Sequence, residues 1–202
     1  MPDYSLETAL MSEGYSHICG IDEAGRGPLA GPVCAAAVVL PIGLEIEGLN
    51  DSKKLTEKKR EALFDKIMEQ ATDYSIAFAT VAEIEEYNIL GATFLAMKRA
   101  AEGLKTPSDY ALIDGNKIPK DFNVPATAVV KGDSKSCSIS AASILAKVSR
   151  DRLMSEYDAL YPQYGFLKHK GYGTAAHYKA LIEHGLSPVH RPSFLKNLND
   201  HR

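Results

Sequence analysis

The sequence lacks the features by which secreted and membrane proteins are recognised. None of its apolar runs approaches the length of about 20 residues that a membrane-spanning helix needs. Residues 1–16 contain Asp3, Glu7 and Glu13 and no long apolar run, which argues against a secretory signal. We therefore expect a soluble, cytoplasmic protein without a membrane partner.

Cysteine is scarce as well. The 202 residues include Cys19, Cys34 and Cys137, which are odd in number and widely spaced, and two of them lie in apolar runs. No cluster of cysteine and histidine has the spacing of a zinc site. This pattern indicates reduced core residues rather than a disulfide framework, in keeping with a cytoplasmic protein.

The sequence also has no internal repeat, low-complexity tract or long linker, and its 45% hydrophobic content predicts one main core. The net charge of −3 hides an asymmetry between the two parts of the chain. Residues 1–115 hold 10 Lys and Arg against 19 Asp and Glu, whereas residues 116–202 hold 13 against 7. A basic second part indicates contact with nucleic acid, although two ordinary solvated faces would give the same counts.

The most informative stretch runs from position 18 to 33. An apolar run ends in Asp22 and Glu23 and then breaks into glycines and prolines, which predicts a buried strand leading into a tight loop. Buried carboxylates need a partner, so the pair implies a bound cation; the alternative is that Asp22 merely caps a turn. Neighbours on a regular strand face opposite sides, so we expect the strand to bend or bulge here, as Gly25 and Gly27 permit.

Alternation and helical spacing predict an α/β protein with five strands. The first two strands should be antiparallel neighbours, because their link is too short for a crossover helix. Acids end three of the strands, at Asp22-Glu23, Asp114 and Asp133, which favours one shared site. The expected strands are 17–23, 33–40, 74–79, 110–114 and 126–130. The expected helices are 1–14, one capped by Thr56, 82–101 with a kink at Gly91, 136–160, and one between Thr174 and Gly185.

Two later stretches are basic. One face of the 136–160 helix is small and basic, able to lie close to another backbone, unless it is simply solvated. Its members are Ser136, Ser140, Ser143, Lys147 and Arg150. Residues 168–174 then mix bases with Tyr172, which Gly171 and Gly173 would leave open for stacking on a base or sugar. The alternative is a tyrosine that packs a loop.

Asp22, Glu23, Asp114 and Asp133 are hard oxygen ligands, which suit Mg²⁺ or Mn²⁺. Carboxylates that hold two such ions about 3.5–4 Å apart recur in phosphoryl-transfer enzymes. Together with the basic and aromatic elements, these acids point to nucleic-acid chemistry.

The motifs, taken together and in order over positions 18–194, resemble those of the type 2 ribonucleases H, specifically bacterial ribonuclease HII. The first is Asp22-Glu23-Ala24-Gly25-Arg26-Gly27, followed by the Asp51-Ser52-Lys53-Lys54-Leu55 segment. Asp114-Gly115 and Lys131-Gly132-Asp133 come next. The last two are residues 141–151 and Lys170-Gly171-Tyr172-Gly173-Thr174.

The resemblance implies a ribonuclease H-like fold, with a five-stranded mixed sheet flanked by helices. One catalytic domain would span residues 1–202, with a helical segment from about 161 completing the substrate groove. The implied activity is hydrolysis of RNA in RNA/DNA hybrids and incision 5′ of ribonucleotides embedded in duplex DNA. The products would carry 3′-hydroxyl and 5′-phosphate ends.

The resemblance also assigns roles to residues. Asp22, Glu23, Asp114 and Asp133 correspond to catalytic ligands of two Mg²⁺ or Mn²⁺ ions. Gly25, Arg26 and Gly27 correspond to the loop that recognises the ribose 2′-hydroxyl, Lys53 and Lys147 to phosphate contacts, and Tyr172 to the aromatic that detects the RNA-to-DNA junction. We expect a monomer, and the tail has no obvious sliding-clamp peptide.

Two other classes of function remain open from the sequence. Another metal-dependent nuclease of this fold would share the carboxylates but would not need Gly25-Arg26-Gly27 or Gly171-Tyr172-Gly173. A non-catalytic nucleic-acid-binding module would not need four acids.

Overall fold

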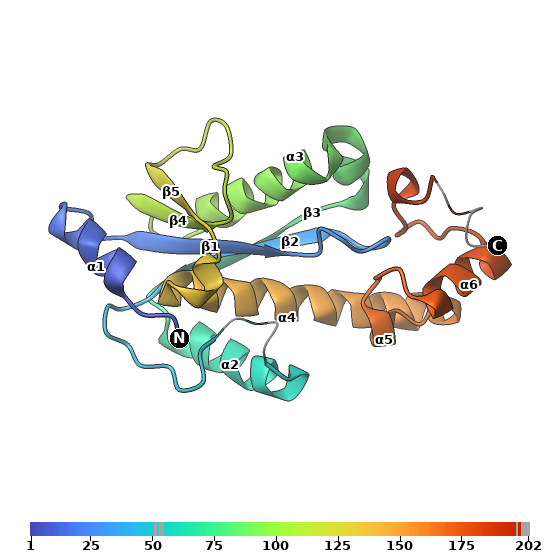
Figure 1. Cartoon of the computed structure of the whole chain (residues 1–202), viewed down its shortest axis with the longest axis horizontal. Coiled ribbons are helices and arrows are strands. Elements are labelled where there is room, and N and C mark those ends of the chain that lie inside the picture. Colours follow the sequence, from blue (N-terminus) through green and yellow to red (C-terminus); the bar gives the residue numbers. More distant parts are fainter. Residues whose placement is uncertain (51, 53–54, 197, 199–202) are drawn as a thin grey trace.

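The computed structural model describes residues 1–50, 52, 55–196 and 198. One five-stranded sheet forms its centre, in the order β3-β2-β1-β4-β5, with helices on both faces (Figure 1). The strands are β1 (Ile18–Ala24), β2 (Val33–Val39), β3 (Asp73–Ala79), β4 (Tyr110–Asp114) and β5 (Ala126–Val129). The main helices are α1 (Ser5–Ser12), α2 (Glu57–Gln70), α3 (Val81–Glu102), α4 (Cys137–Leu160), α5 (Phe166–His169) and α6 (Ala175–His184).

The sheet is mixed, as predicted. β1 pairs with β2 and β2 with β3 in antiparallel fashion, whereas β1–β4 and β4–β5 are parallel pairs. The antiparallel pairing of the first two strands is therefore confirmed. β1 is central and has β4 as its parallel neighbour, so the carboxyl ends of these two strands meet at the same edge of the sheet.

Alternate residues of β2 face two separate cores. Cys34, Ala36 and Val38 pack toward α4 and α2. The residues between them, Val33, Ala35, Ala37 and Val39, pack toward α3 on the opposite face. Figure 1 shows α4 lying along one face and α3 along the other. Small side chains in this strand let both helices approach closely.

Gly20 fixes how close α4 lies to β1. A Cβ built on Gly20 would lie 2.2 Å from the backbone carbon of Ser138, near the start of α4. Ser136 caps that helix, accepting a hydrogen bond from the Ile139 N–H at 3.1 Å. Thr56 and Thr174 cap α2 and α6, as predicted.

The kink in α3 lies at Asn88, and the prediction of Gly91 was wrong. Asn88 adopts φ 59° and ψ 173°, and its side-chain oxygen accepts hydrogen bonds from the N–H groups of Leu90 and Gly91. The asparagine side chain thus caps the second half of the helix. Asparagine tolerates the left-handed region because its short polar side chain bonds locally.

The segment after α4 folds back onto the loop between β1 and β2. Ala30 and His190 form an isolated bridge, and the Gly31 N–H donates to the Val189 carbonyl at 2.8 Å. Figure 1 places α5 and α6 at the far end of α4. Sequence positions about 160 residues apart therefore share one surface.

All three cysteines are buried and free of disulfide bonds, as predicted. Within the described residues, no helix combines the length and apolar character needed to cross a membrane. The cytoplasmic location stays a prediction.

Candidate active site

Asp22 lies near the carboxyl end of β1, on the face that packs against α4. Its side chain is 6% exposed. Burial raises the pKa of Asp22 well above its usual value, and the negative charges of Glu23 and Asp114 raise it further. A hydrogen bond with Ser143 of α4 opposes this shift. A cation placed here would favour the ionised carboxylate.

Glu23 follows without any bulge, so the expected bulge was wrong, and the bend that was its alternative stays a prediction. The register between β1 and β2 runs unbroken from Gly20 opposite Val38 to Ala24 opposite Cys34. Asp22 and Glu23 therefore leave the strand on opposite sides. Both still line one cleft.

Asp114 ends β4 beside Asp22. Ile21 pairs with Ile113 in the parallel register, so the next position on each strand is an aspartate. Asp114 Oδ1 accepts a hydrogen bond from the Gly132 N–H at 2.6 Å. Asp114 also lines a second hollow together with Glu23 and Arg26.

Asp133 is placed differently from the prediction that it ends a strand. It lies in a 3₁₀ turn (Gly132–Ser134), after β5 has ended at Val129 and before α4 begins. It is 8% exposed, and Gly132 next to it anchors Asp114. The turn thus brings Asp133 into the neighbourhood of the β4 end without making it part of a strand.

The donor chemistry of these acids fits divalent cations. Within the described part of the chain, no three His, Cys, Asp and Glu side chains converge closely enough to hold a metal ion. Burial nevertheless raises the pKa of Asp22, and electrostatic repulsion from Glu23 and Asp114 raises it further. Hard oxygen donors under mutual repulsion suit Mg²⁺ or Mn²⁺. The ligand set stays a prediction.

A cleft of about 480 Å³ unites most of the predicted residues. It brings together the carboxylates of Asp22 and Glu23, the loop after β1, one face of α4 and the C-terminal segment. The predicted residues that line it are Asp22, Glu23, Gly25, Arg26, Gly27, Lys147 and Tyr172. Ser52, which belongs to the motif of residues 51–55, lines it too. Ile89 and Phe194 also line it, and the sequence patterns did not single out these two.

Residues 25–32 form the wall between the acids and the C-terminal segment, and we call them the glycine loop. Gly25 has φ 97°, and a Cβ there would lie 2.0 Å from Arg150 Nε. Gly25 is therefore required by both conformation and space. The Arg26 guanidinium is half-exposed and lies 3.3 Å from Glu23 Oε1, which ties the loop to the acids.

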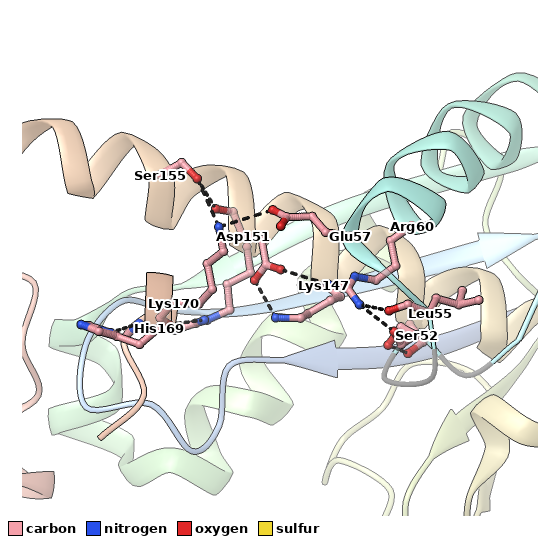
Figure 2. Close-up of polar contacts among 12 residues, drawn as sticks. Ser52, Leu55, Glu57, Arg60, Lys147, Asp151, Ser155, His169 and Lys170 are labelled. Carbon is pink, nitrogen blue, oxygen red and sulfur yellow. Dashed lines mark hydrogen bonds and ion pairs between the residues drawn. The ribbon is translucent and has the colours of Figure 1, made fainter. Parts of the chain in front are cut away.

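Lys147 faces the cleft from α4 and forms an ion pair, Nζ to Asp151 Oδ1, at 2.6 Å (Figure 2). Burial lowers the pKa of Lys147, and the bond to Asp151 opposes that effect. Asp151 also lies 4.0 Å from Arg60, which donates to the carbonyls of Ser52 and Leu55. Lys53, the other predicted phosphate contact, lies outside the described residues.

Tyr172 is 46% exposed and lines the cleft beside Gly27. The interpretation that Gly171 and Gly173 leave its ring open stays a prediction. Gly171 has φ 86°, and a Cβ there would lie 2.7 Å from the Ala30 carbonyl oxygen, so this glycine permits close backbone contact. Lys170, one of the bases noted beside Tyr172, pairs with Glu57 at 3.6 Å and is largely buried (Figure 2).

The predicted basic face of α4 is mostly buried, and its side chains form hydrogen bonds with other segments of the chain. Ser136 donates to buried Glu7 Oε1 at 2.6 Å. Arg150 is 1% exposed and donates to the carbonyls of Ala30, Pro32 and Lys170. The solvated interpretation is thus wrong for Arg150, which lies against the backbone of its own chain.

This sheet order, with acids at the adjoining ends of two central parallel strands and a cleft beside them, defines a nuclease of the ribonuclease H-like fold. The family model for ribonuclease HII matches residues 19–197, and the chain belongs to that family. Ribonuclease HII is an endonuclease that hydrolyses RNA in RNA/DNA hybrids, and the family depends on metal ions.

Individual relatives agree. The chain is 55% identical to the ribonuclease HII of Caldicellulosiruptor saccharolyticus over 195 residues, covering 96% of this chain and 95% of that protein. It is 59% identical to the ribonuclease HII of Desulfitobacterium hafniense (strain DSM 10664 / DCB-2) over 188 residues, covering 93% and 72%.

Among solved structures, ribonuclease H2 from Pyrococcus horikoshii superposes with a TM-score of 0.74 at 27% identity, covering 92% of this chain and 98% of that one. RNase HII from Archaeoglobus fulgidus, solved in a complex with PCNA, has a TM-score of 0.70 at 24% identity, covering 90% and 96%. The second likeness supports the fold.

Proposed function

We propose that Asp22, Glu23, Asp114 and Asp133 hold two divalent ions, Mg²⁺ or Mn²⁺, during hydrolysis. The ions would supply activation of the attacking water and stabilisation of the leaving oxygen. Support comes from the adjacency of Asp22 and Asp114 on parallel strands and from the charge repulsion at Asp22. The Gly132 N–H, at 2.6 Å from Asp114 Oδ1, would orient that carboxylate for its task.

Substrate recognition is assigned to the opposite wall of the cleft. Gly25, Arg26 and Gly27 would bind the ribose 2′-hydroxyl through backbone groups, because detecting one hydroxyl at a sugar distinguishes RNA from DNA. Tyr172, beside Gly27, would stack on the sugar at the RNA-to-DNA junction. Lys147 and Lys53 would contact phosphates, which position the duplex without reading its sequence.

The C-terminal segment, from about residue 161, would complete the substrate groove of a single domain spanning residues 1–202. Its Tyr172 and Phe194 line the cleft together with Asp22. The backbone contacts between positions 29–31 and 189–191 support this arrangement, because they join the segment to the glycine loop.

The observation that carries the proposal is the shared cleft, in which two acids, the glycine loop and an exposed tyrosine meet. The experiment uses a labelled DNA duplex containing one ribonucleotide, incubated with the protein with and without Mg²⁺ or Mn²⁺. We expect one metal-dependent cut 5′ of the ribonucleotide, giving 3′-hydroxyl and 5′-phosphate ends. A continuous RNA/DNA hybrid should also be cut.

An all-DNA duplex of the same sequence is the matched control. Equal cleavage of this duplex would identify a different metal-dependent nuclease on the same fold. Binding of the ribonucleotide duplex without turnover in either metal would indicate a non-catalytic binding module.

The PCNA complex belongs to the Archaeoglobus fulgidus relative. The tail of the present sequence carries no obvious clamp-binding peptide. We propose that this chain acts as a monomer on its nucleic acid, and light scattering with and without duplex would test the stoichiometry.

A further inference from the structure

Arg191 is completely buried, and its guanidinium donates four hydrogen bonds to the glycine loop. Nε donates to the Gly31 carbonyl at 2.8 Å, and Nη2 donates to the Gly25 carbonyl at 2.6 Å. Nη1 donates to the carbonyls of Arg26 at 3.0 Å and Pro28 at 2.8 Å. One side chain from the C-terminal segment thus fixes the backbone of the loop that follows the catalytic strand.

Related contacts hold three of the other four carbonyls of the glycine loop. The Arg191 N–H donates to the Leu29 carbonyl at 2.9 Å. Arg150 donates to Ala30 and Pro32. As far as the described residues go, Gly27 has the one carbonyl of this loop without a hydrogen bond.

Buried arginines without a carboxylate contact are energetically unfavourable, so their presence calls for a reason. Burial lowers the pKa of Arg191, and the positive charge of Arg150 lowers it further. The planar guanidinium compensates by offering several donors in a fixed fork, which lysine does not have. The Arg191 guanidinium carbon also lies over the Phe194 ring, 5.1 Å from the ring centroid.

Peptide geometry links these carbonyl contacts to the cleft. A trans peptide points its C=O and N–H in opposite directions, and the described chain has no cis peptide bond. The Gly25 carbonyl shares a peptide with the Arg26 N–H, and the Arg26 carbonyl shares one with the Gly27 N–H. Because Arg191 binds both carbonyls from the buried side, both N–H groups turn away from it.

Arg26 and Gly27 line the cleft, and neither N–H donates a hydrogen bond to any residue that the structure describes. We propose that Arg191 is a positioning residue for ribose recognition, which aims the Arg26 and Gly27 N–H groups at the 2′-oxygen of the substrate. The inference rests on the proposed function of the glycine loop and names the residue that orients it.

The test is Arg191→Lys, which keeps the charge but loses the fork. Binding is measured in EDTA, so that no turnover occurs, for a DNA duplex with one ribonucleotide and for the all-DNA duplex of the same sequence. We expect the ratio of the two affinities, ribonucleotide duplex over all-DNA duplex, to fall roughly tenfold. A fall of this size corresponds to the loss of about one hydrogen bond to the sugar oxygen. Affinity for the all-DNA duplex should be unchanged.

Tyr164→Phe is the matched control. It removes a hydrogen bond to the Gly185 carbonyl at 2.9 Å within the same C-terminal segment but leaves the glycine loop untouched. Its affinity ratio should equal that of the wild type, measured at a temperature where both proteins are fully folded. An unchanged ratio in folded Arg191→Lys would overturn the positioning role.

A measurement on the wild-type protein covers the case in which Arg191→Lys does not fold. Amide NMR signals of Arg26 and Gly27 are followed while each duplex is added in EDTA. We expect both signals to shift more with the ribonucleotide duplex than with the all-DNA duplex, and equal shifts would refute the proposal. If wild-type protein binds both duplexes equally in EDTA but still cleaves at the ribonucleotide once metal is added, the recognition role of the loop itself is refuted.

Discussion

His190 Nε2 lies 3.0 Å from His177 Nε2 in the buried base of the C-terminal segment. Their other contacts determine which nitrogen carries the proton. His177 Nδ1 lies 2.9 Å from the Tyr172 carbonyl, so it must donate, and its Nε2 must accept from His190. His190 Nδ1 then accepts from the Ser187 N–H at 2.9 Å. Both rings are neutral in this arrangement.

The histidine pair predicts a loss of stability in mild acid. Burial lowers the pKa of His177 and of His190 to about 4, from about 6.5 in the unfolded chain. Between these values the unfolded chain binds more protons, so stability is full above pH 6.5 and falls toward pH 4. A shift of this size in one ring corresponds to about 3 kcal/mol, so we expect the free energy of unfolding to fall by at least that amount over this range.

Urea denaturation at a series of pH values measures this dependence. His177→Gln should flatten the fall between pH 6.5 and 4, whereas His184→Gln, which changes a partly exposed histidine on α6, should not. A wild-type stability that is independent of pH over this range would contradict the buried neutral pair.

Asp22→Asn and Asp114→Asn should each abolish turnover in Mg²⁺ or Mn²⁺. The fold should be unchanged or slightly stabilised, because removing one charge relieves the repulsion that raises the pKa of Asp22. Asp133→Asn should also be severely impaired. Single-turnover cleavage and thermal unfolding without metal provide the two measurements, and substantial residual cleavage by Asp22→Asn would exclude it as a ligand.

Lys147→Ala should weaken hybrid binding and lower the slope of log affinity against log salt by about 0.7–0.9, the value for one phosphate contact. The cut position should stay the same, since phosphate contacts carry no sequence information. Unfolding should also become easier by about 1–3 kcal/mol, because buried Asp151 loses its partner at 2.6 Å.

Lys168→Ala separates these effects, because Lys168 is exposed and does not line the cleft. Its salt slope and stability should match those of the wild type. If Lys147→Ala is less stable but keeps the wild-type salt slope, Lys147 serves only to pair with Asp151.

Local patterns predicted the fold well because the position of a strand end or a helix cap depends on residues that are neighbours in the sequence. The acid at the end of β4 and the caps Thr56 and Thr174 are of this kind. The bulge expected at Asp22 was wrong, because the register between β1 and β2 stays regular through Ala24. Asp22 and Glu23 line one cleft nevertheless, which strand periodicity alone does not predict.

Contacts between distant positions could not be predicted in this way. Arg191 and the glycine loop are about 160 residues apart, and nothing local to Arg191 indicates that it is buried. Similarly, Gly171 was interpreted through Tyr172 next to it, and the structure adds a contact from a distant position, the Ala30 carbonyl, 2.7 Å from where the Gly171 Cβ would lie. A buried guanidinium and a close backbone approach become visible only in three dimensions.

Tyr172→Ala should reduce binding or turnover about ten- to a hundred-fold, because stacking on a sugar or base contributes about 1–3 kcal/mol. Its backbone should remain in place, since the Tyr172 N–H donates to His169 and its carbonyl accepts from His177. Tyr172→Phe keeps the ring and should retain much more activity. Leu167→Ala, exposed in the same segment and outside the cleft, should match the wild type.

The loss in Tyr172→Ala should be larger on a single ribonucleotide followed by DNA than on a continuous RNA/DNA hybrid. Only the first substrate requires the junction to be read at every productive encounter, whereas the hybrid offers many equivalent positions. The measurement is kcat/KM on both substrates, with thermal unfolding of each variant. Equal losses on both would make Tyr172 a general contact of the groove, and a lower melting temperature with unchanged activity per folded molecule would make it a packing residue.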